Sequence, residues 1–223
     1  MARRAFQAAL VAVLAIVLSL WWTKSSPAQP ARDLVTGKNN TVLFLTTETH
    51  GTCNVHVATA YALAGNHPNV QTHYASFPSL RRRISHISNL AESPRGTAPE
   101  TSAITFHALS GLPYKAAAIT AAPGGLAGLI HRPGAAGAKE MCHTMKHAVT
   151  PWTVDDHVAQ YDSARRIIDR VDPSLVVVDL VLYPGLAAVR DSRRKHVVLS
   201  PNVVSGNVPA VQPGHTMLWK YPM

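Results

Sequence analysis

The stretch that most constrains the fold is Thr41–Leu63, TVLFLTTETHGTCNVHVATAYAL, because it joins two different hydrophobic patterns. Val42–Leu45 is a short, unbroken apolar run, which is typical of a strand buried on both faces of a parallel sheet. A polar segment, Thr46–Asn54, follows, and from Val55 the apolar residues take helical spacing until a glycine–asparagine pair provides a stop. The pattern predicts a strand, a loop and a helix.

The same alternation continues along the chain. Further strands are predicted at residues 70–76, 104–109, 175–179 and 196–199, and further helices at residues 78–90, 138–149, 151–171 and 183–190. Ala116–Ala138 is rich in Ala and Gly but lacks the Lys-Ser/Thr of a phosphate-binding loop, so it is predicted to be a surface loop. This order predicts an α/β fold, a Rossmann-like doubly wound parallel sheet with helices on both faces.

Residues 1–24 differ in kind from the rest. Ala5–Trp22 carries no charge, follows a pair of arginines and ends in two tryptophans. As a helix it would be about 27 Å long, enough to cross a bilayer. Its apolar run exceeds that of a secretory signal, so we favour a membrane anchor over a cleaved signal peptide. The sequence thus predicts a single-pass membrane protein of the endomembrane system, with a linker at 25–40 and one domain at 41–223.

The overall charge narrows the range of partners. The chain has 21 Lys and Arg against 12 Asp and Glu, but the excess is scattered. Its two dense runs, Arg81–Arg83 and Arg193–Lys195, are not interleaved with aromatic residues, so no nucleic-acid partner is predicted. His143 and His147 have the spacing of metal ligands on a helix, but the stretch lacks the Glu of a zinc-protease helix and a third ligand is not marked. No metal site is therefore predicted at His143 and His147.

Candidate functional residues follow two of the predicted strands. In open α/β sheets, ligands bind beyond the carboxyl ends of the strands. His50–Asn54 and His56 follow the first strand, and Asp179 ends the buried run LVVVD. Because parallel strands end at the same edge, Asp179 is expected beside the His50–Asn54 loop.

Six segments in order resemble a known family: VLFLTTETHGTCNVHVATAYAL, HYASFPSL, ITFHALSG, PWTVDDHVAQY, VDPSLVVVD and LSPNVV…LWKYP. They are similar to the amino-terminal domain of the UDP-glycosyltransferases of glycosyltransferase family 1, especially the fungal members, and the resemblance covers Val42–Met223. It implies one half of a GT-B fold that binds a lipophilic acceptor without a metal or a cofactor. In that family a carboxyl-terminal domain holds the UDP-sugar, which is a co-substrate.

The resemblance also implies roles for individual residues. Family members use a His in the first strand–helix loop as general base and an Asp that orients it, which is sound chemistry for a neutral imidazole. Asp179 matches that Asp, but aligning the family's Gly-X-X-Asn core on Gly51–Asn54 puts Thr52 at the position of the base. His50, two residues earlier, is our preferred base, and His56 is the weaker candidate. The residues expected to bind the acceptor are Gly51, Thr52, Asn54, His56 and Pro78.

The motifs of a donor-binding domain are missing from the sequence, so the domain is expected to be incomplete at its carboxyl-terminal end. The expected function is therefore that of the acceptor-binding half of a UDP-glycosyltransferase. It would transfer a hexose to a hydroxyl of a lipophilic small molecule or lipid, and it would be inactive without a donor-binding domain or subunit. The alternative is a non-catalytic, membrane-tethered binding or scaffold subunit of a split glycosyltransferase.

Overall fold

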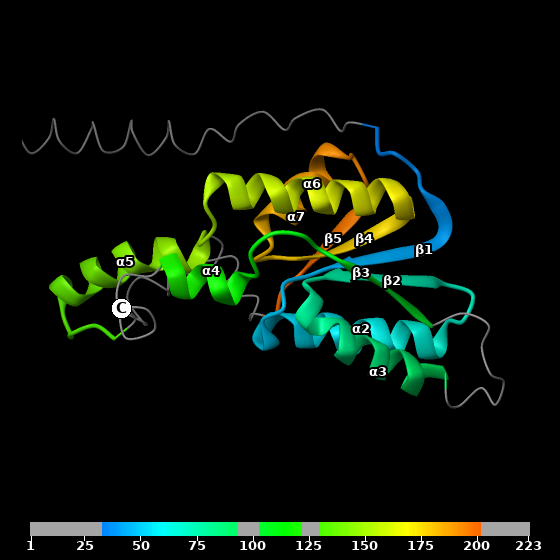
Figure 1. The fold of residues 1–223 in the computed structure, drawn as a ribbon, viewed down its shortest axis with the longest axis horizontal. Helices are drawn as coiled ribbons and strands as arrows, with labels where there is room; N and C mark the ends of the chain where they lie inside the picture. Colours follow the sequence, from blue (N-terminus) through cyan, green and yellow to red (C-terminus); the bar gives the residue numbers. More distant parts are fainter. Residues whose placement is uncertain (1–32, 93–102, 122–129, 202–223) are drawn as a thin grey trace, which may run out of the picture. The chain divides into compact units, whose positions relative to one another are not determined.

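A parallel β-sheet organises the part of the chain that the computed structural model describes, residues 33–92, 103–121 and 130–201 (Figure 1). Its strands are β1 (Lys38–Leu45), β2 (Gln71–Ser76), β3 (Ile104–Ala108), β4 (Pro173–Asp179) and β5 (His196–Leu199). Among the described residues they form a five-stranded sheet in the order β3-β2-β1-β4-β5, and every neighbouring pair is parallel. The chain changes direction across the sheet between β1 and β4, which makes the carboxyl ends of these two strands the topological switch point.

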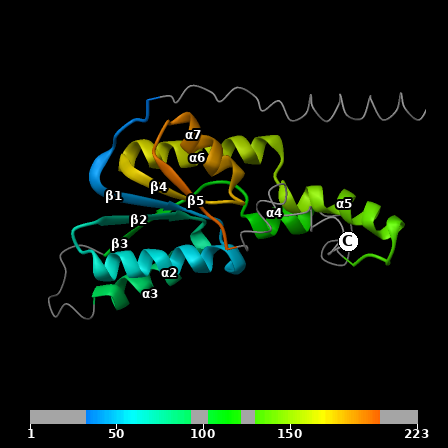
Figure 2. The same ribbon diagram turned by 180° about the vertical axis from the view of Figure 1, so that it is seen from behind.

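The helices cover both faces of the sheet. Their bounds are α2 (His50–Asn66), α3 (Arg81–Glu92), α4 (Tyr114–Ala121), α5 (Ala135–Val149), α6 (Val154–Val171) and α7 (Tyr183–Asp191), with a short 3-10 turn, η1 (Pro78–Leu80), before α3. Helices α2 and α3 lie on one face, and α6 and α7 lie on the other (Figures 1 and 2). The predicted α/β class with a parallel sheet is therefore confirmed.

The central strands are buried on both faces because their side chains alternate between two cores. Within β1, Leu43 and Leu45 pack beneath α6 and α7, whereas Phe44 packs beneath α2 and α3. Val176–Val178 alternate in the same way in β4. These strands are apolar without interruption because helices cover both faces of the sheet, so neither face of the strand is polar.

Helix α6, which fixes one side of the sheet, begins and ends with clear capping interactions. The Thr153 hydroxyl accepts a hydrogen bond from the Asp156 backbone N–H at 3.2 Å, which satisfies one of the helix's unpaired donors. At the other end Asp172 takes the left-handed conformation, φ 53°, and its backbone N–H donates to the Ile168 carbonyl. The Asp172 carboxylate also pairs with Arg194 at 2.6 Å, which ties the end of α6 to the start of β5.

Two expectations about secondary structure were wrong. Helix α2 begins at His50 rather than Val55, so most of the expected loop belongs to its first turn. The segment Ala116–Ala138 is not a loop throughout, because α4 and α5 occupy much of it; residues 122–129 lie outside the described part. Alanine is the strongest helix former, and its high content in this segment outweighs the scattered glycines.

The structure contradicts the expected localisation as a single-pass membrane protein. Within residues 33–92, 103–121 and 130–201, no helix is both long and apolar enough to cross a bilayer. Helix α6 has 18 residues, but its sequence, VDDHVAQYDSARRIIDRV, carries charged side chains throughout. The segment that suggested an anchor, Ala5–Trp22, lies outside the described residues.

Candidate functional site

A buried carboxylate, Asp179, lies at the carboxyl end of β4 and is 0% exposed. Its Oδ2 accepts hydrogen bonds from the backbone N–H of Thr47 at 3.3 Å and from the Thr47 hydroxyl at 2.9 Å. Its Oδ1 accepts from the backbone N–H of Val181 at 3.1 Å. Two segments 132 residues apart therefore meet at the switch point of the sheet.

A second hydroxyl extends this contact outwards. The Thr47 and Thr52 hydroxyl oxygens are 2.8 Å apart, and the Thr52 hydroxyl also lies 3.1 Å from the Thr49 carbonyl. Thr47 is 0% exposed, whereas Thr52, in the first turn of α2, is partly exposed. A continuous chain of hydrogen bonds thus runs from buried Asp179 to the surface.

The two histidine candidates have different surroundings from Thr52. His50 is exposed at the start of α2, and its Nδ1 accepts from a guanidinium nitrogen of Arg83 at 3.3 Å. His56 is 0% exposed and donates through Nδ1 to the Thr52 carbonyl at 3.1 Å. The hydrogen bonds of Asp179 go to Thr47 and Val181, so the side chain that the structure links to this carboxylate is Thr52, through Thr47.

An open pocket of about 490 Å³ lies beside this edge of the sheet. Its lining residues come from the segment between β1 and α2, from the first turn of α2, from η1 and from α4: Glu48, Thr49, His50, Gly51, Ser79, Leu80 and Lys115. Of the expected acceptor-binding residues, Gly51 lines the pocket, and Pro78 is exposed next to two residues that do. Asn54 is exposed one turn further along α2.

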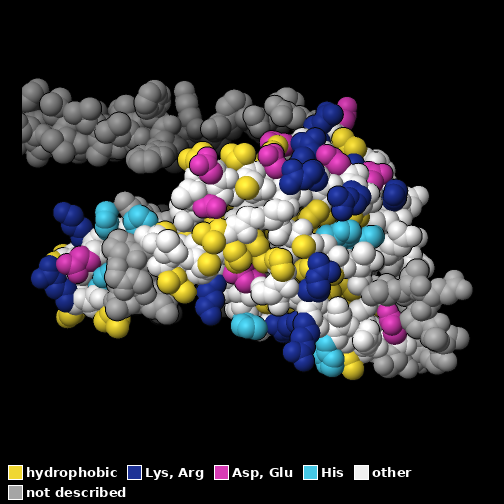
Figure 3. Space-filling model, viewed as in Figure 1, with side chains coloured by type: hydrophobic (Ala, Val, Ile, Leu, Met, Phe, Trp, Pro, Cys, Tyr) yellow, Lys and Arg dark blue, Asp and Glu magenta, His cyan; other side chains and the backbone are white. Residues whose placement is uncertain are grey.

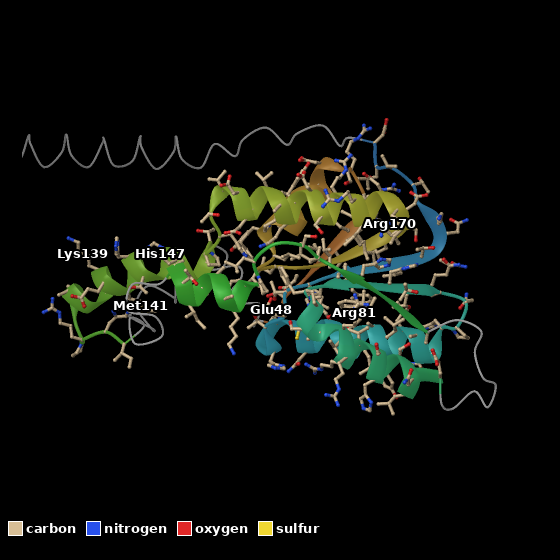
Figure 4. All side chains as sticks on the ribbon, viewed as in Figure 1. Glu48, Arg81, Lys139, Met141, His147 and Arg170 are labelled. Atoms are coloured by element: carbon tan, nitrogen blue, oxygen red, sulfur yellow. The ribbon has the colours of Figure 1, made fainter. Side chains whose placement is uncertain are left out.

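Glu48 connects this pocket to α4, a contact that the sequence did not suggest. One carboxylate oxygen accepts from the Tyr114 backbone N–H at 3.2 Å, and the other accepts from the Lys115 backbone N–H at 2.7 Å. The carboxylate therefore caps the amino terminus of α4, where a negative charge is favoured. Figure 4 shows Glu48 between the start of α2 and α4.

Aromatic residues form an apolar side to the same edge. The rings of Tyr114 and Trp152 meet edge to face with centroids 5.6 Å apart, and the Trp152 indole N–H donates to the Leu112 carbonyl at 2.9 Å. Burial raises the pKa of the Tyr114 phenol, and the nearby charges of Tyr183, Asp179 and Glu48 act in the same direction. On the face shown in Figure 3, hydrophobic side chains gather between α6 and α2.

The described residues contain no group of three or more His, Cys, Asp and Glu side chains that could hold a metal ion. His143 and His147 pack edge to face on α5, with ring centroids 6.0 Å apart. The side chains at this edge of the sheet include hydroxyl groups, the carboxylates of Asp179 and Glu48, and the imidazoles of His50 and His56. Such groups can bind a hydroxylated apolar molecule and accept a proton from it.

The sequence is similar to a curated protein, the glycosyltransferase sdnJ of Sordaria araneosa. The two are 29% identical over 188 residues, which cover 83% of this chain and 36% of sdnJ. The chain thus spans little more than a third of the length of this relative. No family model matches the chain. The similarity to sdnJ supports a glycosyltransferase-like domain.

Solved glycosyltransferase structures show a more distant likeness. The "Glycotransferase of kitacinnamycin" has a TM-score of 0.44 at 12% identity, over 83% of this chain and 38% of that one. The calicheamicin glycosyltransferase CalG4 has a TM-score of 0.45 at 14% identity, over 80% and 40%. The spinosyn rhamnosyltransferase SpnG has a TM-score of 0.42 at 15% identity, over 77% and 37%.

Proposed function

We propose that this chain is the acceptor-binding half of a UDP-glycosyltransferase, a member of family 1 of the fungal type. The complete enzyme transfers a hexose from a UDP-sugar to a hydroxyl of a lipophilic small molecule or lipid. The observation that carries this proposal is the buried Asp179 carboxylate, joined by hydroxyl groups to a partly exposed Thr52 at the switch point of the sheet. The similarity to sdnJ supports it.

In this proposal the acceptor lies along the pocket with its apolar body against the aromatic side of the edge. Gly51, Thr52 and Asn54 of α2 and the turn at Pro78 contact it, while buried His56 supports the site by holding the Thr52 carbonyl. The acceptor hydroxyl points towards the start of α2. A separate donor-binding domain or subunit covers the edge and presents the UDP-sugar, so the chain by itself is inactive.

His50 and Asp179 are the proposed catalytic residues. Nδ1 of His50 accepts from Arg83, so a neutral ring carries its proton on Nε2. Nδ1 is then the nitrogen that can take the acceptor's proton, once the acceptor hydroxyl replaces Arg83 beside it. The buried carboxylate of Asp179 supplies a negative charge at the carboxyl end of β4. This charge stabilises the positive charge that develops on the imidazole of His50 as it takes the proton.

The test combines the full chain with the part of sdnJ that lies outside the matched segment, as a donor-binding partner. Labelled UDP-glucose and a panel of apolar alcohols should yield labelled, apolar-soluble product, and the chain alone should yield none. Asp179→Asn should lower turnover about a hundredfold or more, as expected for loss of a group that accepts or stabilises a proton. Asp162→Asn, an exposed change on α6, is the matched control.

A second candidate function is a non-catalytic binding subunit. It is favoured by one observation, namely that the residue linked to Asp179 is a threonine and not a histidine. Equilibrium binding separates the two functions. Alcohols that bind the full chain but are never glycosylated in the complemented assay would support the binding subunit, and turnover that is abolished by Asp179→Asn would exclude it.

A further inference from the structure

We propose that Thr52 and Thr47 form a hydroxyl relay that carries the proton of the acceptor to Asp179, so that no imidazole is needed as the base. This inference rests on the proposed function, and it puts the relay in place of His50 as the route by which the same site takes up the proton. It makes Thr52 the residue that touches the acceptor, and Thr47 the buried link that touches no substrate.

The hydrogen-bond distances fix the direction of the relay. An ionised carboxylate can only accept hydrogen bonds, so the contact of 2.9 Å between Thr47 Oγ1 and Asp179 Oδ2 uses the single hydroxyl proton of Thr47. The contact of 2.8 Å between the two threonine oxygens then takes its proton from Thr52. The Thr52 hydroxyl also lies 3.1 Å from the Thr49 carbonyl, so its one proton has two acceptors, and the shorter contact is the inward one. When Thr52 donates inwards, its oxygen keeps lone pairs that can accept from a ligand.

Burial decides which group meets the substrate. Asp179 and Thr47 are both 0% exposed, so neither can touch an acceptor in the pocket. Thr52 is the partly exposed end of the chain, one residue from Gly51 in the pocket lining. A proton that leaves the acceptor at this point reaches Asp179 only through the two hydroxyl groups.

The step balances without any other reactant. The acceptor hydroxyl gives its proton to Thr52 Oγ1 while the proton of Thr52 passes to Thr47 and that of Thr47 passes to Asp179 Oδ2. The acceptor oxygen forms a bond to the anomeric carbon, and the bond from that carbon to the diphosphate oxygen breaks, with its electron pair leaving on UDP. Each threonine gains one proton and loses one, and the carboxylate ends as a carboxylic acid.

The hydrogen-bond surroundings of the histidines agree with this assignment. His56 is committed to the Thr52 carbonyl, which positions the first turn of α2 that carries the relay. The contact of His50 within the described residues is to Arg83 on α3 rather than to a carboxylate that would orient it. The relay thus accounts for the threonine at the position where the family resemblance led us to look for a base.

The test uses isosteric changes in the full chain, complemented by the sdnJ part as above. Thr47→Val and Thr52→Val remove a hydroxyl with little change in volume, and each should lower kcat about a hundredfold. Thr47→Val should leave the KM for the acceptor unchanged because Thr47 does not touch it. Thr47→Ser and Thr52→Ser keep the hydroxyl and should restore most of the rate, which a purely structural role for the methyl group would not predict.

Thr72→Val is the matched control for a buried threonine in the same sheet. The Thr72 side chain is 3% exposed, and among the described residues its hydroxyl has no hydrogen-bond partner. This variant should keep both kcat and fold. Circular dichroism establishes folding for every variant, and acceptor binding does so as well for Thr47→Val and Thr72→Val. Thr52→Val, at a partly exposed site, tests the relay even if Thr47→Val does not fold.

The outcomes separate the relay from the proposed function. Folded Thr47→Val and Thr52→Val chains that transfer sugar at the wild-type rate would overturn the relay and leave the glycosyltransferase proposal intact. Serine variants as slow as the valine variants would also overturn it. A wild-type chain that neither binds an apolar alcohol nor supports transfer would overturn the proposed function itself.

Discussion

Two histidines on adjacent strands share a hydrogen bond in a positively charged environment. His73 Nδ1 on β2 lies 3.0 Å from His107 Nε2 on β3, and both rings are partly buried. Lys38 acts on His73 from β1, and Arg170, labelled near the end of α6 in Figure 4, acts on His107. Burial, with these charges, lowers the pKa of both imidazoles, and that of His107 to about 4. The folded chain therefore favours the neutral pair.

This pair predicts a loss of stability in mild acid. In the unfolded chain His107 binds a proton near pH 6.5, whereas in the folded chain its pKa is lowered to about 4. The contribution to stability is thus complete above about pH 6.5 and is lost progressively as the pH falls towards about 4. Urea midpoints measured at pH 7.5 and pH 5 should show this loss, and His107→Asn should reduce the difference.

His86→Asn, an exposed change on α3, is the control for the loss of an ordinary histidine. It should leave the difference between the two midpoints as large as in the wild-type chain. If His107→Asn and His86→Asn have the same pH dependence as the wild type, the His73–His107 pair does not control acid stability.

Single residues also show how far the sequence could predict the candidate site. Asp179 was identifiable because a carboxylate that ends a buried apolar run is a strong local pattern. Thr47 carried no such signal, since its hydroxyl meets the Asp179 carboxylate, 132 residues away, through the β1–β4 pairing. The cap that Glu48 gives to α4 depends on a similar long-range contact, 66 residues apart, which one-dimensional patterns do not contain.

Helix α3 shows at the level of elements how an apolar stripe and the real buried face differ. In the helix predicted at residues 78–90, the helical spacing puts Leu80, Ile84, Ile87 and Leu90 on one apolar stripe. Leu80 and Ile84 are buried, Ile87 is partly buried, and Leu90 is 45% exposed. The stripe therefore leaves the core near the end of the helix, where Ala91 packs inwards instead.

This difference predicts unequal effects of two similar substitutions on α3. Ile84→Ala removes a side chain that is 0% exposed and should lower the free energy of unfolding by about 2–5 kcal/mol. Leu90→Ala, only six residues further along, should change it by no more than about 0.5 kcal/mol. Chemical denaturation of both variants measures the contrast. Equal losses would mean that α3 packs through a different face.

The start of α2 shows why element boundaries escaped prediction. The buried face of this helix is made of Cys53, His56, Val57, Ala60 and Ala64. Small and polar residues on a buried face produce almost no helical periodicity, so the first turns looked like a loop. The strands were easier to predict, because short unbroken apolar runs such as those of β1 and β4, in a chain that alternates strands and helices, are best explained as buried strands.

At the scale of the whole molecule, the two cores share the central strands. Leu43 and Phe44 are neighbours in β1 but belong to different cores, and Val176 and Val177 divide β4 in the same way. A loss of packing on either face therefore destabilises the same two strands, β1 and β4. The strand order itself could not be predicted, since it depends on which apolar runs pair across the sheet.

The shared strands predict a gradient of hydrogen exchange. The amides of β1 and β4 should exchange most slowly, because they are paired on both sides and covered on both faces. The amides of β5 should exchange faster, because β5 is at the edge of the sheet that the described residues form and its Val197 and Val198 are 50% and 38% exposed. Exchange measured by mass spectrometry on the full chain checks this order, and equal protection of β4 and β5 would contradict it.

The common direction of the strands has a practical consequence for protein engineering. The carboxyl ends of the five described strands lie at the edge of the sheet that holds Asp179. The opposite edge, which includes the turn before β2 at residues 67–70, therefore carries none of the proposed chemistry. Dyes, affinity tags or surface-attachment points can be placed there without obstructing a molecule that binds at the edge that holds Asp179.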